Sequence, residues 1–132
     1  MILQKGTYYI GDLCYVMDQE WDEVCQLLEG DQYPNEGQFR LSDGRQFAMF
    51  NTTYGDGEYY DAKGQAYCVD SGSLGCIKVE NLTEKVDEKL GNIVEMPQDF
   101  YCYSDGGCRH WSNRLECPCL RGPALGASTC LC

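Results

Sequence analysis

The chain has 132 residues, a length typical of one domain, and carries ten basic residues against 21 acidic ones, for a net charge of −11. This excess of negative charge argues against nucleic acid and against an anionic membrane surface as partners, because both attract clustered Lys and Arg. No stretch approaches the roughly 18 consecutive apolar residues that a membrane span needs, so we expect no membrane insertion.

The composition also indicates what fills the core. Ten Tyr and two Trp are present, whereas aliphatic residues are sparse. Aromatic side chains bury large areas, and a Tyr tolerates burial when its hydroxyl reaches water or a polar partner. We therefore expect a folded chain with a tyrosine-rich core. The first ten residues lack the basic and apolar segments of a secretory signal, which predicts a cytoplasmic protein or part of a larger soluble assembly.

The first predicted elements are two β-prone segments, residues 7–10 and 14–16, on either side of Gly11 and Asp12. A helix follows, with Asp18 as its N-terminal cap, and runs to about residue 29. Gly30 is a stop signal for this helix. Apolar residues recur inside it at the spacing of one helix face: Trp21, Val24, Cys25 and Leu28.

Two hairpins are predicted next, each with a turn that contains a glycine. The first joins residues 39–41 to 46–50, and the second joins residues 58–60 to 65–69. Glycine can adopt the left-handed conformation that short hairpin loops need. Tight turns of this kind indicate antiparallel pairing.

A second short helix is predicted after these hairpins. Asn81 and Glu84 have the spacing of a capping box, in which each side chain caps a backbone N–H of the first turn. Leu82, Val86 and Leu90 would then lie on one face, and the glycine that follows would end the helix.

Further strands are predicted at residues 74–79, 93–96 and 100–103. Together these elements predict an α+β fold: a small, largely antiparallel sheet with one or two short helices and a Cys-rich C-terminal extension.

The composition changes near residue 101. Residues 1–101 are strongly acidic, whereas residues 102–132 are nearly neutral and show neither helical nor strand periodicity towards their end. We interpret residues 1–101 as a compact acidic domain and residues 102–132 as an extension. The extension holds six of the ten cysteines: Cys102, Cys108, Cys117, Cys119, Cys130 and Cys132.

The last four cysteines form two C-x-C pairs: Cys117, Cys119, Cys130 and Cys132. Four thiolates can hold zinc or an iron–sulfur cluster, although zinc sites more often use C-x₂₋₄-C spacing. An even number of cysteines also suits disulfides, which a cytosolic location disfavours. A third alternative is that these thiols have no role, and we predict no cofactor. The other four cysteines, Cys14, Cys25, Cys68 and Cys76, lie in apolar contexts that are typical of small core residues.

Residues 6–16 have the pattern G-x-Y-Y-I-G-D-x-C-Y-V, and they are followed by Glu20-Trp21, an acidic hairpin at 54–57 and V-D-S-G at 69–72. These segments resemble a family of small uncharacterised proteins from phages, bacteria and large algal viruses. The resemblance covers about residues 5–96 and leaves out the Cys-rich extension. It implies a compact domain but no catalytic residues, because the family has no established activity.

The V-D-S-G segment also resembles the Asp-Ser-Gly loop of aspartic proteases. That chemistry needs two aspartates that share a proton, so a single Asp70 would require a homodimer. The alternative is a polar turn, in which Asp70 and Ser71 bind nearby backbone N–H groups.

The sequence therefore favours a non-catalytic binding or assembly module that contacts a protein partner through a Tyr-rich surface. Tyr offers a large contact area together with a hydrogen-bonding group. The predicted contact residues are Tyr8, Tyr59, Tyr60, Tyr101 and Tyr103. Strand alternation puts Tyr59 and Tyr60 on opposite faces, so at most one of them is in the core. The alternatives are a small hydrolase centred on Asp70 and a metal-binding accessory protein that uses the cysteines of the extension.

Overall fold

The computed structural model of the protein describes residues 3–29, 36–52, 55–60, 65–105 and 108–112, the last stretch and residues 101–105 by their backbone alone. The central sheet has five strands in the order β2-β3-β6-β1-β7. Their bounds are Gly6–Gly11 for β1, Gly37–Arg40 for β2, Gln46–Asn51 for β3, Ser73–Lys78 for β6 and Gly91–Met96 for β7. All pairings in this sheet are antiparallel, so the predicted fold class is confirmed.

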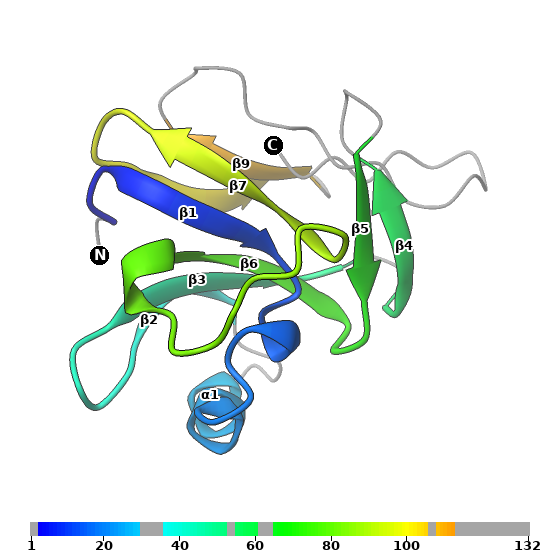
Figure 1. Ribbon diagram of the computed structural model, residues 1–132, viewed down its shortest axis with the longest axis horizontal. Coiled ribbons are helices and arrows are strands. Elements are labelled where there is room, and N and C mark those ends of the chain that lie inside the picture. The colour runs from blue at the N-terminus through cyan, green and yellow to red at the C-terminus, as the bar shows by residue number, and fades with distance from the viewer. Residues whose placement is uncertain (1–2, 30–35, 53–54, 61–64, 106–107, 113–132) are drawn as a thin grey trace.

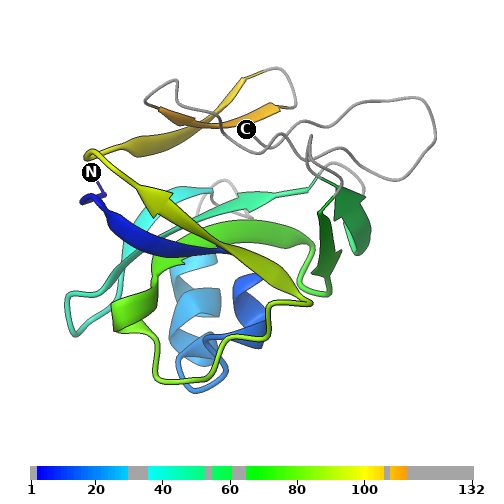
Figure 2. The same ribbon diagram turned by 45° about the horizontal axis from the view of Figure 1, so that its top comes forward.

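Two further hairpins and three helical segments complete the described part of the chain. One hairpin consists of β4 (Gly57–Tyr60) and β5 (Ala66–Val69), and the other of β8 (Tyr101–Asp105) and β9 (Cys108–Ser112). The helix α1 spans Trp21–Leu28, and two 3-10 turns, η1 and η2, span Leu13–Tyr15 and Val79–Asn81. Figure 1 shows α1 on one side of the central sheet and β4–β5 beyond its end. Figure 2 shows the β8–β9 hairpin on the side opposite α1.

Both faces of the central sheet are covered. Side chains alternate along each strand, so Tyr8 and Ile10 point to one face while Tyr9 points to the other. The first face carries the tyrosine cluster, which joins the sheet to β4–β5. Its main members are Tyr8, Ile10, Phe50, Tyr59, Tyr67, Val69, Leu74 and Phe100.

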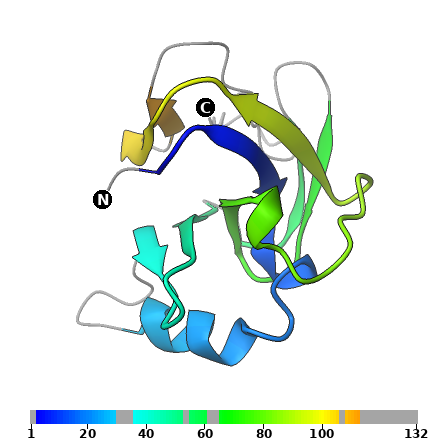
Figure 3. The same ribbon diagram turned by 60° about the vertical axis from the view of Figure 1, so that its left-hand side comes forward.

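The opposite face carries the helix-side cluster, in which α1 and η1 pack against the sheet (Figure 3). Its buried members are Tyr9, Leu13, Val16, Met17, Val24, Leu41, Phe47, Met49 and Ile77. Four tyrosines are at most 2% exposed across the two clusters: Tyr8, Tyr9, Tyr59 and Tyr67. The expected tyrosine-rich core is therefore confirmed.

The ring of Tyr9 fits under the backbone of two paired glycines, Gly11 and Gly91. A Cβ atom on Gly91 would lie 2.6 Å from a ring carbon of Tyr9, and one on Gly11 would lie 2.7 Å from its hydroxyl oxygen. The absence of side chains at these two positions allows β1 and β7 to pair above a large aromatic ring.

Both predicted hairpins are present, but three other local predictions are wrong, two of them near the N-terminus. Residues 14–16 do not form a strand, because the turn η1 follows Asp12, whose side chain accepts a hydrogen bond from the Cys14 N–H. The helix α1 begins at Trp21 rather than near Asp18, and Glu20 at its N-terminal cap makes no side-chain capping bond. Its predicted apolar face is retained, since Val24 is buried and Trp21 packs on the helix-side cluster. Gly30 lies outside the described residues.

The predicted second helix at residues 82–90 is also absent. The turn η2 ends at Asn81, and Leu82 adopts an extended conformation with ψ 138°. The carboxylate of Glu84 accepts a hydrogen bond from the Gln19 N–H at 3.3 Å instead of capping a helix. A helix of this length is marginal in water, and the segment packs on the rest of the fold instead, with Leu82 and Val86 against the helix-side cluster.

Phe100, just before the β8–β9 hairpin, packs in the tyrosine cluster. Phe100 forms an antiparallel bridge with Leu3 and an edge-to-face contact with Tyr8, at a ring-centroid distance of 4.9 Å. The β8–β9 hairpin follows directly. Residues 113–132 lie outside the described residues, so the division at residue 101 stays a prediction. Within the described ranges, no helix is long and apolar enough to cross a membrane.

Candidate functional site

The predicted tyrosine surface is not brought together among the residues whose side chains are described. Tyr8 and Tyr59 are each only 2% exposed, so their rings belong to the core. Tyr60 is 40% exposed, as the alternation with Tyr59 predicted, and its hydroxyl donates to Glu58 at 2.8 Å. The side chains of Tyr101 and Tyr103 lie outside the described part of the structure.

The G-D-L-C-Y and V-D-S-G segments meet at a buried carboxylate, that of Asp12, which has no exposed surface. Its Oδ2 accepts the backbone N–H groups of Asp70 and Ser71, each at 2.7 Å. Its Oδ1 accepts the Cys14 N–H at 3.0 Å and the Ser71 hydroxyl at 2.7 Å. Four hydrogen bonds satisfy this buried charge, and they join the end of β1 to the turn between β5 and β6.

Asp70 has a different environment, because it is exposed on the turn that Asp12 holds. Its carboxylate accepts a hydrogen bond from the hydroxyl of Tyr15 at 2.7 Å. Gly72 follows with a φ of 73°, a left-handed conformation that glycine adopts without strain. The V-D-S-G segment thus forms a polar turn as one alternative predicted, but the carboxylate that binds its backbone N–H groups comes from Asp12.

The thiol and phenol beside this turn are not activated for nucleophilic chemistry. Burial, together with the carboxylate of Asp12, raises the pKa of Cys14 well above its ordinary value. Burial and the hydrogen bond to Asp70 likewise raise the pKa of Tyr15. A thiol of this kind stays protonated at neutral pH, whereas a nucleophilic cysteine needs a lowered pKa.

The four cysteines with described side chains form no disulfide within the described part of the chain. Cys76 is buried in the tyrosine cluster, while Cys14, Cys25 and Cys68 are half-buried. No group of His, Cys, Asp or Glu residues in the described ranges has the arrangement of a metal site. The predicted zinc or iron–sulfur ligands lie outside those ranges: Cys117, Cys119, Cys130 and Cys132.

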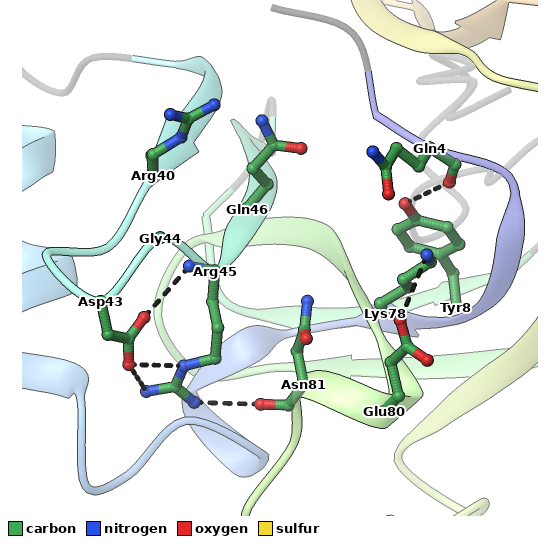
Figure 4. A pocket seen from close by; sticks show the side chains of 10 residues that line it. All are labelled: Gln4, Tyr8, Arg40, Asp43, Gly44, Arg45, Gln46, Lys78, Glu80 and Asn81. Carbon is green, nitrogen blue, oxygen red and sulfur yellow. Dashed lines mark hydrogen bonds and ion pairs between the residues drawn. The ribbon is translucent and has the colours of Figure 1, made fainter.

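A polar pocket of about 480 Å³ opens at one end of the central sheet. Four of its lining residues come from four neighbouring strands, because Arg40 is paired with Gln46, and Tyr8 with Lys78. Phe47 is paired with Ile77, so in this antiparallel pair the adjacent residues Gln46 and Lys78 also lie opposite each other. By strand alternation, these four side chains share the face of the tyrosine cluster. Figure 4 shows them around the pocket with Gln4 and Asn81.

Arg45 forms one wall of this pocket and is fully engaged. Its guanidinium donates to Asp43 at 2.8 Å, to the carbonyl oxygen of Asn81 at 3.0 Å and contacts the carboxylate of Glu20 at 3.0 Å. The bonds to Arg45 lower the pKa of Asp43. Burial lowers the pKa of Arg45, but the hydrogen bonds to Glu20 and Asp43 outweigh this effect and raise it. These contacts tie the β2–β3 hairpin to η2 and to the start of α1.

Lys78 is paired as well, with Glu80 at 3.2 Å. Its aliphatic chain lies over Gly6, where a Cβ atom would come within 2.5 Å of the Lys78 Cε. Tyr8 is buried, but its hydroxyl reaches the pocket and donates to the carbonyl oxygen of Gln4 at 2.6 Å.

Four other polar side chains that line the pocket make no hydrogen bond or ion pair with the described residues: those of Gln4, Arg40, Gln46 and Asn81. Arg40 is also exposed. Together with Arg45 and Lys78 it brings three of the seven basic residues of the acidic segment 1–101 to this one place. The pocket therefore combines one guanidinium and three amides that have no partner among the described residues.

Comparison of the chain with models of protein families, with curated proteins and with solved structures finds no match. The resemblance noted from the sequence thus stays a prediction.

The sequence interpretation missed both Asp12 and the pocket. Asp12 was assigned only to a turn, since nothing in one sequence pairs it with residues 70 and 71. The pocket had only a partial signal: the predicted first hairpin brings Arg40 and Gln46 to neighbouring strands, but its four-residue turn would pair Gln46 with Leu41, whereas the observed register pairs it with Arg40. The contributions of Lys78 and Asn81 depend on the strand order, which no local pattern indicates.

Proposed function

We propose that this protein is a non-catalytic binding module and that it contacts a protein partner at the polar pocket. The observation that carries the proposal is a contrast between two groups of polar side chains. Asp12 and Ser71, which could take part in chemistry, are engaged in holding the fold together. Arg40 and Gln46 stand at the pocket without partners among the described residues. This proposal keeps the binding function expected from the sequence and moves its surface to a pocket in which Tyr8 is the one tyrosine of the predicted contact set.

A segment of protein chain suits the lining of this pocket. Small-molecule sites are mostly apolar and aromatic, whereas Tyr8 is the one aromatic residue among the ten that line this pocket. The free amides of Gln4, Gln46 and Asn81 can each donate and accept hydrogen bonds, as peptide groups require. Pre-positioned polar groups of this kind give specificity to a partner that supplies the complementary pattern.

Selection of displayed random peptides on the purified protein tests this function. We expect wild-type protein to enrich related sequences, and we expect those peptides to lose binding to a Gln46→Ala variant. Lys85→Gln is the matched control, because Lys85 is exposed and lies outside the pocket. Failure to enrich any peptide family, or enrichment that Gln46→Ala leaves unchanged, would overturn the proposal.

A further inference from the structure

We infer that the polar pocket recognises the side-chain carboxylate of an Asp or Glu residue in a partner peptide, and that Arg40 is the principal residue that binds it. This inference rests on the proposed binding function and specifies its chemistry. The net charge of −11 repels anions in general, so a carboxylate would have to be held by the pocket's own cation and hydrogen-bond donors.

The charges of the pocket identify Arg40 as the available cation. Arg45 has its guanidinium donors directed to Asp43, Glu20 and the Asn81 carbonyl. Lys78 has Glu80 within 3.2 Å. Arg40 makes no ion pair in the described part of the chain, so no described residue compensates its positive charge.

An arginine is well suited to this ligand. Its planar guanidinium presents donors in a fork that matches the two oxygens of a carboxylate, whereas an ammonium group acts as a point charge. Gln46 stands directly opposite Arg40 in the antiparallel register. Side chains at such positions have Cβ atoms about 5 Å apart, so one bound group can contact both.

The same charges favour a single negative charge over a phosphate. Asp43 and Glu80 also line the pocket, and they would repel a dianion more strongly than a monoanion. One free guanidinium balances one carboxylate. Around it, the amides of Gln4 and Asn81 are in reach of the peptide groups that would flank the bound residue.

Glu80 is expected to oppose this ligand. Its side chain is 70% exposed while it pairs with Lys78, and an ion pair with that exposure holds its partner only weakly. An incoming carboxylate can therefore compete for Lys78. Removal of the Glu80 charge should strengthen binding, which a purely structural role for the Lys78–Glu80 pair would not produce.

The experiment is an NMR titration of the full chain with three probes: acetyl-glutamate N-methylamide, its glutamine counterpart and inorganic phosphate. We expect the glutamate probe to shift the backbone signals around β2, β3 and the end of β6 saturably, with at least about fivefold higher affinity than the glutamine probe. Arg40→Gln should weaken glutamate binding about tenfold, Glu80→Gln should strengthen it, and Lys85→Gln should leave it unchanged apart from a small general charge effect.

Each other outcome overturns the inference. Equal responses to the glutamate and glutamine probes would exclude a carboxylate as the recognised group, and stronger binding of phosphate would exclude the preference for a single charge. Saturable glutamate binding that Arg40→Gln does not weaken would remove the assigned ligand. The proposed function is tested separately. If the selected peptides bind at the pocket but contain no acidic groups, the binding function is supported and the carboxylate inference fails. If the glutamate probe binds but no peptide family is selected, the pocket binds a carboxylate and the proposed peptide-binding function fails.

Discussion

The buried carboxylate of Asp12 allows the sharpest test of the fold, because one side chain connects two segments that are far apart in the sequence. Replacement by Ala removes the acceptor of four hydrogen bonds, two from the backbone of Asp70 and Ser71, one from Cys14 and one from the Ser71 hydroxyl. Replacement by Asn keeps the shape but removes the charge. It also puts an NH₂ group, which can only donate, in the place of one of the two oxygens that accept hydrogen bonds.

The two substitutions should differ in magnitude. A hydrogen bond to a charged acceptor contributes about 1.5–3 kcal/mol, but the four bonds of Asp12 share one group and do not add. Asp70 and Ser71 are exposed, so water can reach part of the vacated site. We therefore expect Asp12→Ala to lower the free energy of unfolding by about 4 kcal/mol, a large part of the typical total of about 5–15 kcal/mol. Asp12→Asn retains the bonds to one oxygen and should cost about 2 kcal/mol.

Urea denaturation followed by circular dichroism measures both changes, and thermal melting should show a decrease of roughly 15 °C in Tm for Asp12→Ala. Asp70→Asn is the matched control, since it replaces an exposed carboxylate and leaves the Asp70 N–H in place. It should cost less than about 0.5 kcal/mol, because its one hydrogen bond is solvent-accessible. A loss below about 1 kcal/mol for Asp12→Ala would refute the role of this carboxylate as the link between β1 and the β5–β6 turn.

Three further predictions follow from the core and the V-D-S-G turn. Gly91→Ala should lower the free energy of unfolding by about 1–3 kcal/mol in urea titration, because its Cβ would overlap the ring of Tyr9; an unchanged midpoint would contradict this packing. Burial raises the pKa of Tyr9 and of Cys14, so these groups stay protonated in the folded protein while they ionise in the unfolded chain above about pH 10 and pH 8.5, respectively. Stability measured by urea should therefore fall with rising pH, by about 1.4 kcal/mol per pH unit for each group, and Tyr9→Phe should reduce this slope. If the alternative of an aspartic hydrolase were correct, wild-type protein would cleave peptides and Asp70→Asn would not; we expect no cleavage by either.

Features that depend on neighbouring residues could be predicted from the sequence. The two hairpins follow from β-prone segments around glycine turns, and the opposite orientation of Tyr59 and Tyr60 follows from strand alternation. The apolar face of α1 was correct although the first turn was not. Local patterns fail where tertiary contacts compete, as at Glu84, which has the spacing of a helix cap but binds the Gln19 N–H instead.

Features that join distant segments could not be predicted in this way. The carboxylate of Asp12 binds the backbone of Asp70 and Ser71, which lie 58 and 59 positions further along the chain. A single sequence contains no signal for a contact at that separation. The contact with Asp12 also changes the functional interpretation of the V-D-S-G segment. Read alone, the V-D-S-G segment suggests a catalytic aspartate, whereas in the fold its backbone binds another aspartate and its own carboxylate accepts a phenol hydrogen bond.

The two sites also differ in what their polar groups imply. A buried carboxylate must be satisfied inside the protein, or its burial would cost several kcal/mol, so the complete bonding of Asp12 explains its presence without any ligand. The polar groups of the pocket are not all explained by contacts within the described protein. Arg45 and Lys78 are compensated by acidic neighbours, but Arg40 adds a positive charge that no described residue balances. An exposed arginine alone would need no explanation. An arginine that faces a glutamine in register, at the edge of a pocket lined by free amides, presents the donor pattern of a recognition site.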